Sequence, residues 1–267
     1  MDEAIKNFPK QFAYEPKINN EDKLKKFSKF VVVGMGGSGH AADLLKVWRP
    51  DLELVVHRNY GLPSVPEKYL EESLIIASSY SGNTEETLSG YDEAQSRGLS
   101  AAAVSVGGKL LEHAKEQGVP YIELPDTGIQ PRSSLGFMFR ALLKLMGEEE
   151  ALEQTYNLAL DADSLEGHGK ELAEKLNGKV PVIYSSSRNL AIANNWKIKF
   201  NETGKIPAFY NIFPELNHNE MAGFDIKDST KNLSSNFSFI FLRDSSDQQY
   251  IQSRMQITKK LYEARNL

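Results

Sequence analysis

Short runs of apolar residues recur along the first half of the chain, each followed by a stretch of helical or turn character. These runs lie at 30–36, 52–60, 73–81, 100–106 and 120–125. Their apolar residues are consecutive rather than alternating, which is typical of strands buried on both faces of a parallel sheet. The pattern predicts an α/β domain, closed by an apolar helix at 132–147.

A second and shorter α/β series follows a charged segment. Residues 148–179 are mostly charged helix formers with a weak apolar stripe, which predicts a connecting helical segment. Beyond it, strands are predicted at 180–187, 207–212 and 238–244, with helices at 189–202, near 215–221 and at 247–264. We therefore expect an N-terminal subdomain (1–147), the connecting segment (148–179) and a second subdomain (180–267) with about three strands.

Composition narrows the class of partner. The 267 residues are 40% hydrophobic, enough for one large domain or two of about 100–150 residues each. The net charge of −5 comes from 31 basic and 36 acidic residues without a long block of one sign, so neither nucleic acid nor a membrane is expected as a partner. A small-molecule partner is expected instead.

Cysteine and histidine usage bears on cofactors and location. The chain has no cysteine, which excludes disulfides and thiolate chemistry, and its five histidines are scattered, so no metal is expected. No apolar run approaches the roughly 18 residues of a membrane span, and the N-terminal stretch MDEAIKNFPKQF is charged and has no apolar h-region. A cytoplasmic enzyme or binding protein is the expectation.

The stretch VVVGMGGSGHAADLL (31–45) predicts a strand, a glycine turn and the start of a helix. Helix-start N–H groups and glycines together favour an anion close to the backbone. The spacing also matches the G-x-G-x-x-G dinucleotide fingerprint. This loop alone leaves a dinucleotide fold and a sugar-phosphate fold open.

A second loop, SSYSGNTEETLSG (78–90), places several hydroxyl groups before another helix. We expect Asn83 to cap that helix, Glu86 to complete a capping box, and Gly98 to end it in a left-handed conformation. Such a turn can hold a phosphate without a lysine. The second strand ends in His57-Arg58 without the acid that binds a ribose, which disfavours NAD more than NADP, because Arg58 could serve a 2′-phosphate.

Five motifs together resemble the bifunctional phosphoglucose/phosphomannose isomerases of the sugar isomerase (SIS) fold. They are VVVGMGGSG, SYSGNTEETL, IQPRSSLG (129–136), NETGKIPAFYN (201–211) and PELNHNE (214–220). The resemblance implies two SIS subdomains, each a flavodoxin-like parallel sheet flanked by helices, and a homodimer with its active site between subunits. It also implies interconversion of fructose 6-phosphate with glucose 6-phosphate and mannose 6-phosphate through a cis-enediolate, without a metal or other cofactor.

The same resemblance assigns roles to individual residues. Arg132 resembles the arginine that stabilises the oxyanion, and Glu202 the base that moves the proton between C1 and C2. Glu202 is expected near the C-terminus of a helix, where the negative end of the helix dipole makes a carboxylate a better base. The residues that would bind substrate are Ser79, Ser81 and Thr84 around the phosphate, and Gly36, Gly37 and Ser38 along the sugar.

His218 resembles the group that opens the sugar ring. Its neighbours Asn217, Asn219 and Glu220 are candidates for fixing its tautomer. The family continues beyond the position of Leu267 with further strands and a lysine that reaches the active site, so we expect the second subdomain to be shortened. The lysine's role is carried to neither Lys259 nor Lys260.

Two other functions fit parts of the sequence. A non-catalytic SIS module that senses a sugar phosphate fits a shortened second subdomain, although it would need neither Glu202 nor His218. An NADP-linked dehydrogenase rests on the GMGGSG fingerprint alone.

Overall fold

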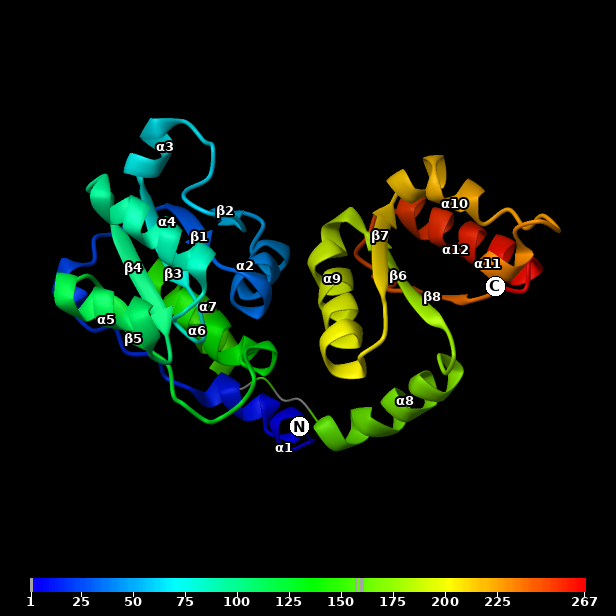
Figure 1. Ribbon diagram of the computed structural model, residues 1–267, viewed down its shortest axis with the longest axis horizontal. Helices are drawn as coiled ribbons and strands as arrows, with labels where there is room; N and C mark the ends of the chain where they lie inside the picture. Colours follow the sequence, from blue (N-terminus) through cyan, green and yellow to red (C-terminus); the bar gives the residue numbers. More distant parts are fainter. Residues whose placement is uncertain (1, 157, 159–160) are drawn as a thin grey trace. The chain divides into compact units, whose positions relative to one another are not determined.

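The computed structural model describes residues 2–156, 158 and 161–267, which fall into two compact units. The first unit is Met1–Ser164 and the second is Leu165–Leu267, so the boundary lies inside the segment predicted to connect two subdomains. Figure 1 draws both units along the chain. Each is described by itself below.

The first unit is built on a five-stranded parallel sheet. Its strands are β1 (Lys29–Val33), β2 (Glu53–His57), β3 (Ser73–Ser78), β4 (Ala101–Ser105) and β5 (Tyr121–Glu123). All neighbouring pairs run parallel in the order β2-β1-β3-β4-β5, which is the flavodoxin-like order. The α/β prediction is therefore confirmed, and the five predicted strands form.

Helices cover both faces of this sheet. On one face, α2 (Gly36–Trp48) and α6 (Leu135–Met146) pack on the side chains of Val32 and Ile76. On the other, α4 (Glu85–Ser96) and α5 (Gly108–Gln117) pack on Val31 and Ile75. All four of these strand residues are fully buried, which explains why the strands are apolar at consecutive positions. The remaining elements are α1 (Asp2–Lys6), α3 (Glu67–Glu71), α7 (Glu149–Tyr156) and 3₁₀ turns at Phe8–Ala13, Glu21–Lys23 and Pro131–Ser133.

The second unit holds a three-stranded parallel sheet. Helix α8 (Ala162–Lys175) crosses the unit boundary and precedes β6 (Val180–Ser186), β7 (Phe209–Phe213) and β8 (Phe237–Phe241). Their order, β7-β6-β8, repeats the pattern of the first three strands of unit 1. The predicted three-strand, flavodoxin-like arrangement is confirmed.

This smaller sheet also has a helix on each face (Figure 1). Helix α9 (Leu190–Lys199) packs its Ala193 on Ile183, and α12 (Gln249–Ala264) packs Met255 and Tyr262 on the face that carries Tyr184. The short elements are a 3₁₀ turn at Ser187–Asn189, a π-helical turn at Phe200–Gly204, the 3₁₀ helix η6 (Glu215–His218), α10 (Glu220–Gly223) and α11 (Lys231–Ser234). None of the helices among the described residues has the length and apolar character needed to cross a membrane.

Several helix boundaries differ from the prediction. Helix α4 starts at Glu85 with Thr84 as its N-cap, so the prediction of Asn83 as the cap and Glu86 at the third helical position is wrong. Asn83 instead bonds within the loop, where its backbone N–H donates to Ser81 Oγ at 3.3 Å. The left-handed end of α4 at Gly98 is confirmed, with φ of 65°. Helix α6 starts at Leu135 rather than 132, because a separate 3₁₀ turn precedes it.

Candidate active site

The glycine loop and the hydroxyl-rich loop meet at one edge of the first sheet. They follow β1 and β3, which are neighbours, so both loops leave from the carboxyl ends of adjacent strands. The buried hydroxyl of Ser38 accepts a hydrogen bond from the backbone N–H of Tyr80 at 3.0 Å, and Ser78 Oγ donates to the Ser38 carbonyl at 3.1 Å. Ser38 therefore links the start of α2 to the loop before α4.

The hydroxyl-rich loop is held in one shape by its own polar groups. Ser79 Oγ lies 2.9 Å from Thr84 Oγ1 and accepts from the backbone N–H of Gly82 at 3.1 Å. Gly82 has φ of 71°, and a side chain there would overlap the carbonyl oxygen of Gly107. Ser79 is buried, Thr84 is half-buried and Ser81 is exposed.

The first turn of the helix that follows this loop is acidic. Glu85 and Glu86 occupy the first turn of α4, and Tyr60 donates to Glu85 at 3.3 Å. The pKa of Tyr60 is raised, first by the charge of Glu86 and then by that of Glu85. An anion bound here would therefore depend on hydroxyls and on the N–H groups of the first helical turn, which have no intrahelical acceptor.

Arg132 lies on a third loop of the same unit, in the 3₁₀ turn between β5 and α6. A Cβ added at Gly37 would lie 3.1 Å from the carbonyl oxygen of Pro131 and 3.5 Å from Arg132 Cα, so a glycine here lets the two loops pack closely together. Gln11 anchors the turn, because its Nε2 donates to the Ser133 carbonyl at 2.6 Å and its Oε1 accepts from Gly136 N at 2.9 Å. Sequence reasoning missed Gln11, since only the tertiary fold brings it to this loop.

Three neighbouring loops of unit 1 thus carry most of the predicted site residues. The glycine loop touches the hydroxyl-rich loop through Ser38 and touches the Arg132 turn through Gly37. The residues gathered in this way are Gly36, Gly37, Ser38, Ser79, Ser81, Thr84 and Arg132.

Arg58, the residue that would have to bind a 2′-phosphate in a dinucleotide fold, has another partner. Its guanidinium forms an ion pair with Asp43 of α2. Because Asp43 neutralises the arginine, Arg58 is a poor candidate for binding a phosphate.

Glu202 and His218 belong to unit 2. Helix α9 ends at Lys199, and a π-helical turn continues directly from it to Gly204. Glu202 lies in this turn, so its predicted position near the C-terminus of a helix is confirmed. This turn is closed by Asn201, whose Nδ2 donates to the Ile206 carbonyl at 2.9 Å, and it ends at the left-handed Lys205. The Glu202 side chain is half-buried.

His218 is the last residue of the 3₁₀ helix η6, and it is exposed. The sequence predicts that Asn217, Asn219 or Glu220 fixes its tautomer. In the part of the chain that the structure describes, this prediction is wrong, because the side chains of all three form hydrogen bonds to residues other than His218. Asn217 Nδ2 donates to Thr258 Oγ1 at 2.9 Å, and Asn219 Nδ2 donates to Glu215 Oε1 at 2.8 Å.

Glu220 accepts two hydrogen bonds inside unit 2. Its carboxylate accepts from Tyr184 Oη and from Asn211 Nδ2, each at 2.5 Å. Burial raises the pKa of Tyr184 far above its usual range, and the bond to Glu220 raises it further. Glu220 stands out in the sequence as the last residue of the PELNHNE motif. Its partners could not be predicted, because Tyr184 and Asn211 are brought together by the register of β6 and β7.

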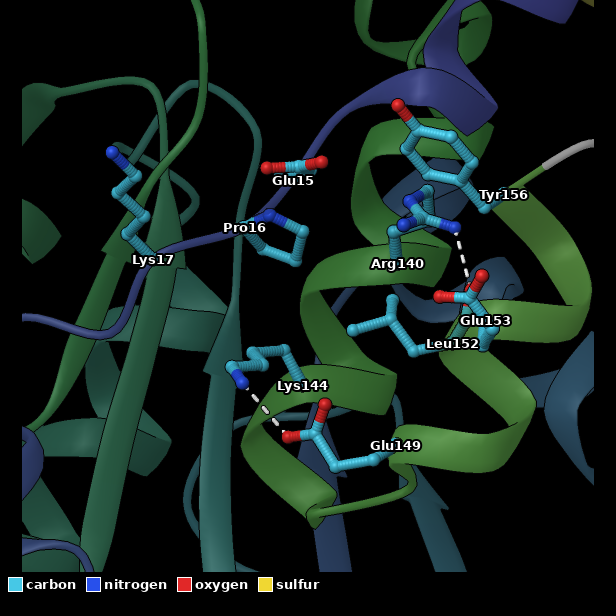
Figure 2. A pocket seen from close by; sticks show the side chains of 9 residues that line it. All are labelled: Glu15, Pro16, Lys17, Arg140, Lys144, Glu149, Leu152, Glu153 and Tyr156. Carbon is cyan, nitrogen blue, oxygen red and sulfur yellow. Dashed lines mark hydrogen bonds and ion pairs between the residues drawn. The ribbon is translucent and has the colours of Figure 1, made fainter.

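A separate cavity of about 460 Å³ lies in unit 1 (Figure 2). Figure 2 shows that both acidic and basic side chains line it, with Lys144 Nζ 2.7 Å from Glu149 Oε1 and the Arg140 guanidinium beside Glu153. None of the predicted site residues lines this cavity. In the described ranges, no three His, Asp or Glu side chains gather closely enough to hold a metal ion.

The chain is similar to known proteins over nearly its whole length. Residues 165–267 match the model of the bacterial phospho-glucose isomerase C-terminal SIS domain. The bifunctional phosphoglucose/phosphomannose isomerase of Aquifex aeolicus is 36% identical over 97% of this chain and 80% of that protein. The protein of the same name from Caldicellulosiruptor bescii is 37% identical over 98% of this chain and 82% of that protein.

The fold has relatives among solved structures as well. The structure of tagatose-6-phosphate ketose/aldose isomerase from Escherichia coli superposes with a TM-score of 0.66 at 15% identity, covering 99% of this chain and 78% of that one. At this identity the likeness concerns the fold alone. The sequence identity to the Aquifex and Caldicellulosiruptor proteins decides the family: the chain belongs to the bifunctional phosphoglucose/phosphomannose isomerases.

Proposed function

We propose that the protein interconverts fructose 6-phosphate with glucose 6-phosphate and mannose 6-phosphate. The observation that carries the proposal is the meeting of the α4 start with the glycine loop, tied by the bond from Tyr80 N to Ser38 Oγ. This arrangement offers hydroxyls and N–H groups to a phosphate, and bare backbone to the sugar chain beside it. Its position at the carboxyl ends of β1 and β3 is where open parallel sheets bind ligands.

The proposed mechanism divides the reaction among two sets of binding residues and three catalytic residues. Ser79, Ser81 and Thr84 hold the phosphate, while Gly36, Gly37 and Ser38 line the sugar. His218 transfers the proton that opens the ring, and Glu202 takes a proton from C1 or C2 and returns it to the other carbon. Arg132 stabilises the oxyanion of the cis-enediolate formed in between.

The assembly and setting belong to the same proposal. We infer a homodimer with its active site at the subunit interface, acting in the cytoplasm without a metal or nucleotide cofactor. The family membership supports this inference, since the resemblance implies such an assembly.

Incubation of the protein with fructose 6-phosphate tests the proposal. We expect both glucose 6-phosphate and mannose 6-phosphate to accumulate, measured by chromatography, at a rate that a metal chelator does not change. Binding without product would favour the sugar-phosphate sensor, and a spectral change with NADP(H) would favour the dehydrogenase. Either result would contradict the isomerase proposal.

A further inference from the structure

The Glu220 carboxylate joins the start of α10 to two strands of the second sheet. Tyr184 of β6 and Asn211 of β7 are partners in the strand register, so their side chains lie next to each other on one face. Each donates to a different oxygen of Glu220, Tyr184 Oη to Oε1 and Asn211 Nδ2 to Oε2. The carboxylate therefore binds both strands at once.

The partners of this side chain suit a carboxylate better than an amide. Tyr184 is fully buried, with its ring among the aromatic side chains of the core, and its hydroxyl has Glu220 as an acceptor. Asn211 presents its NH₂ group to Glu220 because its own Oδ1 already accepts from Ile212 N at 2.8 Å. Two donors, Tyr184 Oη and Asn211 Nδ2, thus face the side chain at position 220. A glutamine there would offer one acceptor oxygen to these donors and would place an NH₂ donor where the second carboxylate oxygen lies.

The main chain at His218 is fixed from both sides. On the N-terminal side, Leu216 is fully buried and Asn217 is bonded to Thr258 of α12. On the C-terminal side, Asn219 Oδ1 accepts from the backbone N–H of Glu220 at 2.5 Å, and the Glu220 side chain is bound to the sheet. The exposed imidazole is therefore carried on a short segment that is held at both ends.

We propose that Glu220 is a positioning residue for His218: by bonding Tyr184 and Asn211 it fixes the segment from which the imidazole reaches the ring oxygen of the substrate. The inference rests on the proposed function, in which His218 opens the ring. In this role Glu220 need touch no reacting atom, so its loss should affect ring opening and leave the proton transfer between C1 and C2 intact.

A substrate that cannot form a ring separates these two steps. Fructose closes its furanose ring through the 5-hydroxyl, so 5-deoxyfructose 6-phosphate remains open and needs no ring opening. For Glu220→Gln we expect the kcat on fructose 6-phosphate to fall about 10–100-fold, the loss typical of a displaced catalytic group, with little change in KM. On 5-deoxyfructose 6-phosphate, kcat should stay within about twofold of the wild type.

Tyr184→Phe provides a second variant that keeps the aromatic core and removes one of the two bonds. It should show a smaller loss of the same selective kind. Glu263→Gln is the matched control, since Glu263 lies in the same unit, on α12, and pairs at the surface with Lys259 at 3.5 Å. It should leave both substrates unaffected.

Equal losses on the two substrates, or no loss on either, would overturn the positioning role while the wild type remained an isomerase. A wild type inactive on both substrates would overturn the proposed function and this inference with it. If Glu220→Gln does not fold, the same comparison is made with Tyr184→Phe. Equal losses of kcat on the two substrates, or no loss on either, would overturn the positioning role in that case as well.

Discussion

Thr84 combines two features that make it the most informative residue of the proposed phosphate site. It is the N-cap of α4, yet its side chain makes no capping bond to the helix, and its Oγ1 lies 2.9 Å from Ser79 Oγ. Thr84→Val keeps the shape and removes the hydroxyl. Losing a hydrogen bond to a charged group costs about 1.5–3 kcal/mol, so KM should rise about 10- to 150-fold with a smaller change in kcat.

Ser96→Ala is the control for this variant, because Ser96 lies at the other end of the same helix and its hydroxyl donates to the local Glu93 carbonyl at 2.9 Å. Its steady-state kinetics should match the wild type. An unchanged KM for Thr84→Val would place the phosphate on another loop.

Glu202 is the residue on which the proposed chemistry depends. Glu202→Gln preserves size and hydrogen-bonding reach but cannot accept the proton from C1 or C2. Turnover should fall by at least the ~10²–10⁴-fold attributed to general base catalysis, while substrate affinity barely changes. The measurements are the isomerisation rate and the incorporation of solvent deuterium at C1 and C2.

If Glu202→Gln kept a near wild-type isomerisation rate and near wild-type incorporation of solvent deuterium, another residue would have to be the base. Of the neighbouring acids, Glu220 is committed to Tyr184 and Asn211, and Glu215 lies 2.8 Å from Asn219. Such a result would therefore remove Glu202 from the mechanism without offering a well-placed replacement in these motifs.

At the scale of elements, the turn before α4 depends on a glycine for two separable reasons. Gly82 has φ of 71°, and a Cβ there would overlap Gly107 O and lie 2.6 Å from Ser105 Oγ. Gly98, at the other end of the helix, has φ of 65° but open space around it. Replacing either glycine with alanine should cost about 1–2 kcal/mol in backbone strain.

Gly82→Ala should cost a further ~1–3 kcal/mol because the methyl group displaces main chain in a packed loop. We expect a lower midpoint in thermal unfolding for Gly82→Ala than for Gly98→Ala, and a raised KM for Gly82→Ala alone. Equal midpoints and equal KM values for the two variants would contradict the packing of this turn against Gly107.

The elements that could be predicted from the sequence are those whose apolar pattern is dictated by burial. The strands of unit 1 were predictable because residues such as Val31 and Val32 are buried on opposite faces. The cap of α4 was not, because Asn83 is drawn into the loop by Ser81 and by Lys109, whose backbone N–H donates to Asn83 Oδ1 at 3.2 Å. Local propensity cannot report a bond to a residue 26 positions away.

The same limit applies to the site. The glycine and hydroxyl loops could be placed together from the sequence, because parallel strands bring their carboxyl ends to one edge. The bonds from Gln11 to the Arg132 turn and from Tyr184 and Asn211 to Glu220 could not, because they depend on packing between distant segments.

At the scale of the whole molecule, the proposed residues divide between the two units. Arg132 and the phosphate-binding residues lie in Met1–Ser164, while Glu202 and His218 lie in Leu165–Leu267. In the proposed homodimer, each active site takes His218 from the partner subunit. The protein should therefore sediment as a dimer at micromolar concentration, and its specific activity should fall on dilution below the dissociation constant.

Mixing two inactive variants tests where each active site obtains its groups. Arg132→Ala and His218→Ala should each be nearly inactive alone. If the partner supplies His218, a mixed dimer holds one site with both substitutions and one intact site, so an equal mixture after subunit exchange should recover about a quarter of the wild-type activity. If one chain supplies both residues, every site in the mixed dimer lacks one group and no activity returns. A fully active monomer, or a mixture that stays inactive although exchange is verified by mass-tagged subunits, would contradict the shared site.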